Sequence, residues 1–412
     1  GCNLSGIFAS FGKAKVFMIC RSKEKAEKAV EEAIKSVRAE AIRPSLIPLD
    51  YDDLKDCVPS SDLVLECVAE EYDVKKETYR LIHPFLRDHT IIASVTSGLS
   101  IQLLSEVFEE KYRKNYLGLH FFNPPYHMSL CEVIPSTRTS RDIKDNLKGY
   151  LKEVLYRKVV EVKDQPAFLG NRIGFQFINE ALQYAEQYKE FGGIDYIDSI
   201  LGQYTGRSMA PIVTADFVGL DIHKSIVDNL YDNTDDFARN TFLLPQFVKE
   251  LVREGRLGRK VGEGFYKTMI DGDGVKHRYV YDIKSMEYRK IIQYHFPFSE
   301  QMIEKLANGD YIDAMHILES SKSTEAQICL YFLVKYITYS ISIAMSVSDS
   351  LHDADDVMAA GFNWIPPLSL IKALGGSVKY KELTKSLLGI ELTRIDIPDS
   401  LYDYRSFLKA KH

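Results

Sequence analysis

The sequence has few of the residues that define specialised classes of protein. It contains one tryptophan in 412 residues, and its six cysteines form no Cys-x-x-Cys pair and no Cys/His ligand spacing. This argues against a disulfide scaffold and against a metal site, and isolated thiols are typical of a reducing, cytoplasmic setting. We interpret the cysteines as small core side chains.

The sequence also has no large excess of positive or negative charge. The chain has 52 basic and 58 acidic residues, a formal net charge of −6, and no Lys/Arg-rich segment interleaved with aromatic residues, so nucleic acid is not an expected partner. No signal or transit peptide is visible, although the chain begins at Gly1. The long apolar run at 327–347 contains Lys335, Thr338, Ser340 and Ser342, which favours a buried helix over a membrane span.

The first third of the chain alternates between apolar and charged segments. Three short apolar runs, at 15–20, 62–68 and 90–97, are typical of buried parallel strands. Between the first two lies a charged segment with one apolar face, at 22–41, and Ser22 is placed to cap it as a helix. This order predicts a doubly wound α/β domain with its ligand at the carboxyl ends of the strands.

After about residue 165 the pattern becomes helical. The segment 170–188 carries an apolar stripe at helical spacing, and a Gly-rich break at 258–267 and the turn "DGDG" at 271–274 come before a last, mostly helical part. We therefore expect an α/β domain at 1–164, a helical domain at 165–270, a linker at 271–290 and a second helical domain at 291–412.

Two segments of these helical parts resemble each other. "SMAPIVTADFVGLD" (208–221) and "WIPPLSLIKALGG" (364–376) share a proline, an apolar alternation and a glycine at similar offsets, each after an acidic segment. An internal duplication explains this, and chance similarity between amphipathic helices is the alternative that stays open.

The N-terminus and the end of the first apolar run are candidates for cofactor binding. The Gly-x-Asn-x-x-Gly pattern that begins at Gly1 lies where a dinucleotide-binding loop belongs, although the strand that should precede it is absent. An acidic residue that favours NAD would follow the run at 15–20, yet the chain has Cys20, Arg21, Ser22 and Lys23. These basic and hydroxyl groups suit the 2′-phosphate of NADP, and a solvated helix start is the alternative.

His120 is the candidate for proton transfer. Histidines among aromatic residues are commonly core residues, but Glu132 follows 12 positions later, and Pro124 and Pro125 between them predict a turn that folds one segment onto the other. A carboxylate on one imidazole nitrogen fixes the tautomer and leaves the other nitrogen to take a proton. Such a pair suits the oxidation of an alcohol.

Five segments in this order resemble the 3-hydroxyacyl-CoA dehydrogenase family. They are "DLVLECVAEEYDVKKETY" (62–79), "ASVTSGLSI" (93–101), "GLHFFNPPYHMSLCEVI" (118–134), "LGNRIGFQFINEA" (169–181) and "GRKVGEGFY" (258–266). The resemblance implies a Rossmann-like domain followed by two all-α domains, a duplicated form of the helical domain found at the C-terminus of 6-phosphogluconate dehydrogenase. The second helical copy resembles that of longer, multifunctional members, and it lacks the Asn-Arg pair of the first.

The resemblance also implies roles for individual residues. Carried over position by position, they are catalytic His120 and Glu132, substrate-binding Ser97 and Asn171, and cofactor-binding Gly1, Leu4, Arg21, Glu70, Lys75 and Ser97. Gly1 and Leu4 fall on the second and third glycines of the family's fingerprint, so Leu4 departs from the pattern.

The implied function is interconversion of (3S)-3-hydroxyacyl-CoA and 3-oxoacyl-CoA, of short chain such as 3-hydroxybutyryl-CoA, with NAD or, because Arg21 follows Cys20, NADP. The resemblance also implies a place in fatty acid β-oxidation and a chain that is a monomer or a homodimer. It implies association with an enoyl-CoA hydratase and no membrane partner. Two alternatives stay open: a sugar-acid dehydrogenase acting on a substrate such as L-gulonate, which "NPPY" also resembles, and a binding module that has lost its cofactor.

Overall fold

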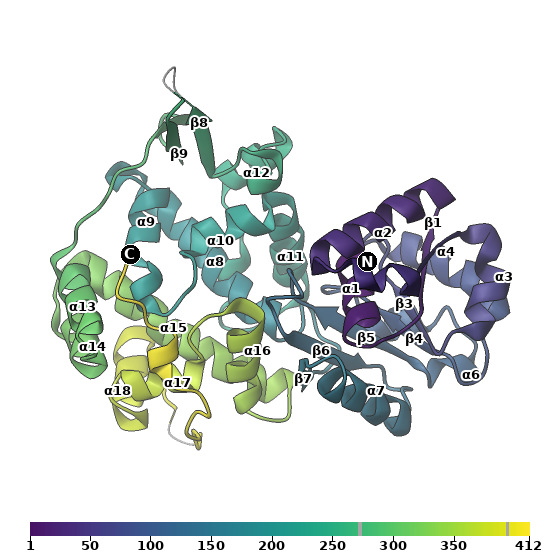
Figure 1. Cartoon of the computed structure of the whole chain (residues 1–412). Coiled ribbons are helices and arrows are strands. Elements are labelled where there is room, and N and C mark those ends of the chain that lie inside the picture. Colours follow the sequence, from purple (N-terminus) through teal and green to yellow (C-terminus); the bar gives the residue numbers. More distant parts are fainter. Residues whose placement is uncertain (271–273, 393–394) are drawn as a thin grey trace. The chain divides into compact units, whose positions relative to one another are not determined.

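The computed structural model describes residues 1–270, 274–392 and 395–412, and its contacts divide the chain into two units (Figure 1). The first unit contains Gly1–Phe168 and two short pieces from later in the chain, Val347–Asp349 and Ala360–Phe362. The second unit contains the other described residues from Leu169 to His412.

The first unit is an α/β domain. Its strands are β1 (Val16–Cys20), β2 (Leu46–Asp50), β3 (Leu63–Glu66), β4 (Ile91–Ser94), β5 (Tyr116–Phe121), β6 (Leu130–Pro135) and β7 (Lys158–Glu161). Its helices are α1 (Cys2–Ser10), α2 (Lys23–Val37), α3 (Leu54–Cys57), α4 (Tyr72–Ile82), α5 (Ile101–Ser105), α6 (Glu110–Arg113) and α7 (Arg141–Glu153).

The strands form two sheets. One has the order β3-β4-β5-β6-β7, parallel except for the antiparallel pair β5–β6, and the other is the parallel pair β1–β2. The three predicted strands and the doubly wound class are confirmed. Among the described residues no strand pairs with both β1 and β3, so the two sheets are separate.

Local sequence explains the helix that follows β1. Ser22 has extended backbone angles and its hydroxyl accepts the backbone N–H of Lys25 at 3.4 Å, as an N-cap does. The helix ends at Arg38, whose left-handed conformation stops the hydrogen-bond ladder. The predicted helix at 22–41 is therefore confirmed, and it ends four residues earlier than the charged segment does.

The core of the first unit lies between one sheet face and helices α1 and α7. Alternate residues of β5 and β6 point into it, among them Leu119 and Val133, and they pack with Leu4 of α1 and Leu151 of α7. Because side chains alternate along a strand, the residues between them, His120 and Glu132, are directed to the opposite face. The core packing thus determines which face of the sheet presents the predicted catalytic pair.

The second unit is mostly helical. Its helices are α8 (Gly170–Gln187), α9 (Ile194–Ile200), α10 (Pro211–Val218), α11 (Leu220–Asn233), α12 (Gln246–Arg253), α13 (Pro297–Ala307), α14 (Tyr311–Ser320), α15 (Thr324–Val347), α16 (His352–Phe362), α17 (Pro367–Ala373) and α18 (Ser377–Leu388), the ends of α15 and α16 being counted with the first unit. The predicted helix at 170–188 is confirmed as α8. Helix α15 is long and apolar enough to cross a membrane, but 83% of its most apolar stretch is buried within the protein, as expected of a core helix.

The structure corrects the expectation of a linker at 271–290. Most of it forms strands β9 (Lys276–Asp282) and β10 (Glu287–Lys290), which join β8 (Tyr266–Ile270) in an antiparallel sheet of order β10-β9-β8. The aromatic and β-branched residues of "RYVYD" favour a strand, a preference that the nearby turn residues obscured. The predicted turn at 271–274 lies outside the described residues except for Gly274, and the proposed domain limits stay a prediction.

Two corresponding carboxylates support the expected duplication. Asp198 of α9 accepts the N–H groups of Ile212 and Val213 at the start of α10, and Asp355 of α16 accepts the N–H of Leu368 at the start of α17. Each capped helix begins with a proline. Equivalent caps in both halves are easier to explain by descent from one unit than by chance, although the duplication stays a prediction.

Candidate functional site

His120 and Glu132 form a hydrogen-bonded pair in the first unit. They are directly paired residues of the antiparallel strands β5 and β6, and Nδ1 of His120 lies 2.6 Å from Oε2 of Glu132. The expected turn between the strands therefore brings the two side chains together. The carboxylate favours a proton on Nδ1, which leaves Nε2 as the nitrogen for proton exchange with a ligand.

The pair is held in an apolar environment. His120 is 4% exposed and Glu132 is 0% exposed, and the imidazole contacts the rings of Phe122 and Phe168 at centroid distances of 4.4 and 5.6 Å. Phe122 also contacts Phe362, a residue of α16 that belongs to this unit. Exclusion of water strengthens the interaction of Glu132 with a positively charged imidazole.

Ser97 lies in a turn that Glu70 holds. Oε1 of Glu70 accepts the backbone N–H of Ser97 at 2.7 Å and the hydroxyl of Thr96 at 2.6 Å. The Thr96 oxygen in turn accepts the N–H groups of Gly98 and Leu99. Glu70, predicted as a cofactor contact, therefore also determines the conformation of the loop that carries Ser97.

Lys75 lies deeper than its predicted role as a cofactor contact suggests. Its side chain is 0% exposed, and Nζ lies 2.9 Å from Oε1 of Glu66 and 3.4 Å from Oε2 of Glu70. The ammonium is thus enclosed between two carboxylates. The sequence resemblance placed Lys75 near the cofactor but gave no indication of Glu66 as its main partner.

A cavity of about 410 Å³ lies at the N-terminus of α1. Gly1, Leu4 and Ser97, three of the predicted site residues, line it together with Cys2, Asn3, Cys67, Val95, Phe121 and Asn123. Helix α1 has no side-chain N-cap, so the N–H groups of its first turn are directed to this end of the helix without a side-chain acceptor. Such a terminus beside a cavity suits the pyrophosphate of a dinucleotide, and the residues present therefore fit the cofactor.

Leu4 is a helix-packing residue as well as a cavity residue. It is 5% exposed and packs in the core against the sheet. The close approach that a fingerprint glycine usually allows occurs instead at Gly6, where an added Cβ would lie 2.8 Å from Cγ1 of Val37 in α2. The sequence contained this signal, since Gly6 ends the Gly-x-Asn-x-x-Gly pattern.

The end of β1 presents both a basic and an acidic group. Arg21 is exposed and Ser22 is engaged as the cap of α2, whereas Asp50 of β2 is paired in register with Cys20. Side chains paired on adjacent strands point to the same face of the sheet. Asp50 was not predicted as a site residue, because the strand partner of Cys20 cannot be identified from spacing alone.

Asn171 belongs to the second unit, where it is the second residue of α8 and is buried. Its neighbour Arg172 forms an ion pair with Asp236, with Nη2 2.8 Å from Oδ2, and Tyr339 of α15 donates its hydroxyl to the same carboxylate at 2.9 Å. Helix α15 thus supports the first turn of α8.

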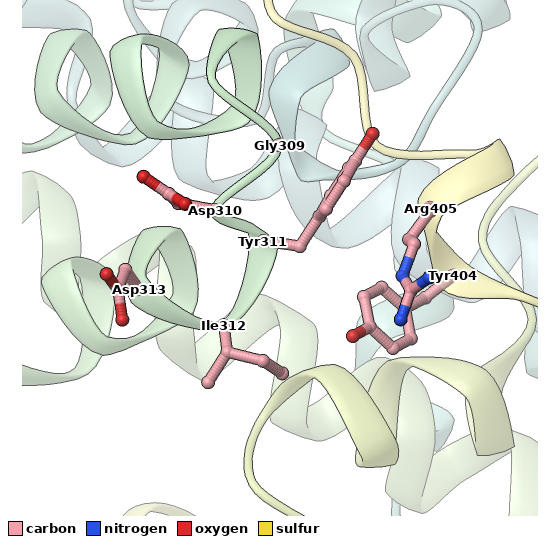
Figure 2. Close-up of a pocket in the computed structure, with 7 residues that line it drawn as sticks. All are labelled: Gly309, Asp310, Tyr311, Ile312, Asp313, Tyr404 and Arg405. Carbon is pink, nitrogen blue, oxygen red and sulfur yellow. The ribbon is translucent and has the colours of Figure 1, made fainter.

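Two further observations concern metal binding and a second pocket. In the part of the chain that the structure describes, no group of three or more His, Cys, Asp and Glu side chains is arranged to hold a metal ion. A second pocket lies in the second unit, between the start of α14 and the segment of Tyr404 and Arg405 (Figure 2). It contains no predicted site residue.

The fold and this site define a dinucleotide-binding α/β protein with a histidine–carboxylate pair. Residues 3–165 match the family model described as "3-hydroxyacyl-CoA dehydrogenase, NAD binding domain", and residues 168–268 match "3-hydroxyacyl-CoA dehydrogenase, C-terminal domain". The chain belongs to the 3-hydroxyacyl-CoA dehydrogenase family, as the five sequence segments predicted.

Individual relatives agree with this assignment. The chain is 30% identical over 332 residues to a probable 3-hydroxyacyl-CoA dehydrogenase of Bacillus subtilis, which covers 80% of this chain and 41% of the relative. It therefore spans about two-fifths of the length of the first curated relatives that it matches, 41% in two cases.

Solved structures show the same fold. The (S)-3-hydroxybutyryl-CoA dehydrogenase of Ralstonia eutropha has a TM-score of 0.55 and 30% identity, with 64% of this chain and 93% of that chain covered. The 3-hydroxybutyryl-CoA dehydrogenase of Escherichia coli has a TM-score of 0.67 and 19% identity, with 95% of this chain and 93% of that chain covered. The latter likeness extends the fold over nearly the whole chain.

Proposed function

We propose that this chain interconverts (3S)-3-hydroxyacyl-CoA and 3-oxoacyl-CoA. The observation that carries the proposal is the buried His120–Glu132 pair, with 2.6 Å between Nδ1 and Oε2, in a chain of the 3-hydroxyacyl-CoA dehydrogenase family. A short acyl chain is the proposed substrate because the Ralstonia eutropha structure, at 30% identity, is that of a 3-hydroxybutyryl-CoA dehydrogenase. This activity places the protein in fatty acid β-oxidation.

His120 is the proposed acid–base group. In the oxidative direction Nε2 takes the proton of the 3-hydroxyl group while C3 loses its hydrogen with both bonding electrons, and a bound nicotinamide dinucleotide supplies the acceptor for that electron pair. Nδ1 keeps its proton toward Glu132, whose negative charge stabilises the imidazolium. In the reductive direction the same imidazolium returns the proton to the 3-oxo oxygen.

Other residues have binding roles in this proposal. The cavity residues Gly1 and Leu4 and the first turn of α1 hold the cofactor phosphates, and Ser97 orients the substrate oxygen. Asn171 keeps its predicted role as a substrate-binding residue. Each of these roles lowers the barrier through orientation rather than through proton transfer.

We propose NAD rather than NADP as the cofactor. The Asp50 carboxylate, in register with Cys20, provides the negative charge that position 20 lacks, and it disfavours a 2′-phosphate there. The positive charge of Arg21 opposes this preference, because it favours the 2′-phosphate of NADP. Asp50→Asn is expected to raise the ratio of NADPH to NADH turnover, and Arg21→Ala to lower it.

The experiment is reduction of acetoacetyl-CoA, followed by absorbance, with NADH and NADPH in parallel. Turnover with NADH supports the proposal, and faster turnover with NADPH overturns the cofactor assignment. No turnover from folded protein with either cofactor contradicts the function. Oxidation of L-gulonate would then favour the sugar-acid alternative, and calorimetry showing no binding of either cofactor would favour a binding module.

The partners and the setting of the chain are further proposals. Association with an enoyl-CoA hydratase is favoured because the first curated relatives are nearly twice as long as this chain. A cytoplasmic location rests on the pattern of isolated cysteines, and all six are free thiols. Co-purification with a hydratase from the source cell tests the first proposal.

A further inference from the structure

A buried ion pair lies behind the loop that carries Ser97. Glu66 is the last residue of β3 and Lys75 lies in the first turn of α4, and their side chains are 1% and 0% exposed. Removing two charges from water is costly, and neutral replacements of similar volume are often as stable. Fold stability alone is therefore a weak explanation for this pair.

Glu66 fixes the position of the Lys75 ammonium. Both carboxylate oxygens of Glu66 accept from Nζ, at 2.9 and 3.1 Å. The remaining capacity of the carboxylate is filled by the N–H of Val68 and by the hydroxyls of Tyr79 and Ser94, at 2.7 to 2.8 Å. A carboxylate with this many donors has one orientation, so the ammonium it binds is fixed as well.

The ammonium has a second partner on the side of the candidate site. Its Nζ lies 3.4 Å from Oε2 of Glu70, while Oε1 of the same carboxylate accepts the N–H of Ser97 and the hydroxyl of Thr96. Glu70 is 39% exposed, and the ammonium is the partner of its second carboxylate oxygen. The contacts run continuously from Glu66 through Lys75 and Glu70 to Ser97.

We propose that Glu66 and Lys75 are positioning residues for Ser97, acting through Glu70. This inference rests on the proposed function, in which Ser97 orients the substrate oxygen. Lys75 then contributes to catalysis through the loop and not by direct contact with the cofactor. Its contribution appears in turnover rather than in the affinity for the dinucleotide.

The test uses a neutral version of the pair. Lys75→Met alone would leave a buried charge on Glu66, so the informative protein is the double variant Glu66→Gln with Lys75→Met, which keeps volume and removes both charges. Hydrogen exchange of the peptide that covers residues 94–100 is measured first, without any substrate. The Ser97 amide is expected to exchange about tenfold faster in the double variant.

Steady-state kinetics with acetoacetyl-CoA give the second readout. The double variant is expected to lose about 10- to 100-fold in kcat, with the KM for NADH within about twofold of the parent. Glu70→Gln is expected to lower kcat similarly, and adding it to the double variant should lower kcat no further, because all three residues act through one contact. A raised KM for NADH with kcat retained would show instead that Lys75 contacts the cofactor. If the losses in kcat of Glu70→Gln and of the double variant multiply in the combined protein, the residues act independently.

Tyr79→Phe is the matched control. It removes a donor to the same Glu66 oxygen without touching Glu70, so it should lower stability but leave kcat and the exchange of Ser97 unchanged. If Tyr79→Phe lowers kcat as much as the double variant does, a general loosening of the core explains both and the proposal is wrong. An inactive parent protein would refute the proposed function, whereas unchanged Ser97 exchange in the double variant would refute the positioning role alone.

Discussion

His120 and Glu132 are directly opposed on the antiparallel strands β5 and β6, and the carboxylate lies 2.6 Å from Nδ1 of the imidazole. Both side chains are directed away from the core that α1 and α7 cover, since their neighbours in sequence fill that core. The register of one strand pair therefore places the acid–base group and its stabilising charge together. A slip of one residue would separate them.

Glu132→Gln tests the electrostatic part of this pair. The amide keeps the shape of the carboxylate but not its charge, so the imidazolium is less stable and kcat is expected to fall about 100-fold. The measurement is kcat for acetoacetyl-CoA reduction. Glu161→Gln is the control, because Glu161 lies on the next strand and pairs with Lys144 and Lys148, and its kcat should remain near that of the parent. Equal losses in both variants would argue against a special role for Glu132.

The packing of α1 on α2 makes Gly6 a sensitive position. In Gly6→Ala the added Cβ would lie 2.8 Å from Cγ1 of Val37 and 3.1 Å from the carbonyl oxygen of Ala33. We expect a loss of about 1–3 kcal/mol in the free energy of unfolding despite the better helix propensity of alanine. Gly149→Ala in α7 is the control, since nothing lies within 4 Å of its added Cβ, and it should raise stability by up to about 1 kcal/mol. Urea unfolding measures both, and a stabilised Gly6→Ala protein would contradict the close packing.

His223 makes stability depend on pH. Burial lowers its pKa from 6.5 to about 3, and its Nε2 lies 2.9 Å from the amide oxygen of Asn179. The folded protein keeps this imidazole neutral, whereas the unfolded chain binds a proton below pH 6.5. Its contribution is therefore complete above pH 6.5 and is lost as the pH falls toward 3.

The measurement compares urea unfolding of the parent and of His223→Gln at pH 7.5 and 5.5. The parent is expected to lose about 1.4 kcal/mol more than the variant over this interval, the effect of one proton bound about one unit below the unfolded pKa. If the free energies of unfolding of the two proteins differ by the same amount at both pH values, His223 is protonated in the folded state as readily as in the unfolded chain.

The corresponding caps of the two helical halves should behave alike. Asp198 accepts two backbone N–H groups and the hydroxyl of Tyr266, whereas Asp355 accepts one backbone N–H and the hydroxyl of Ser400. Asp198→Asn and Asp355→Asn each replace one acceptor oxygen with an NH₂ group that faces one of these donors, so each should lower the free energy of unfolding by about 1–3 kcal/mol. Asp313→Asn, which removes an exposed partner of Lys305, should change it by less than about 0.5 kcal/mol. No effect at Asp355 would remove the structural argument for duplication.

The sequence predicted most of the first unit because its signals are local. Apolar runs, the capping Ser22 and the prolines between His120 and Glu132 act within a few residues, and the structure has strands, a helix and a turn at these places. The antiparallel pairing of β5 and β6 follows from the short turn between them.

Other features depend on contacts between distant segments and could not be predicted in this way. Asp50 lies beside Cys20 only because β1 pairs with β2, and Glu66 meets Lys75 only because β3 and α4 fold together. The strands at 276–290 were missed because turn residues next to them dominated the local pattern. Asn123, which lines the cavity, lies within the stretch that resembles the family, but nothing in its immediate sequence distinguished it from a turn residue.

The most direct test of the central claim is the turnover of His120→Gln. Acetoacetyl-CoA reduction with NADH is measured for the parent, for His120→Gln and for His127→Gln, an exposed histidine of the adjoining loop, together with NADH binding by fluorescence. We predict a loss of about 10²–10⁴-fold in kcat for His120→Gln alone, with NADH binding unchanged in all three proteins. Unchanged turnover of His120→Gln would contradict the account and remove this histidine from the reaction.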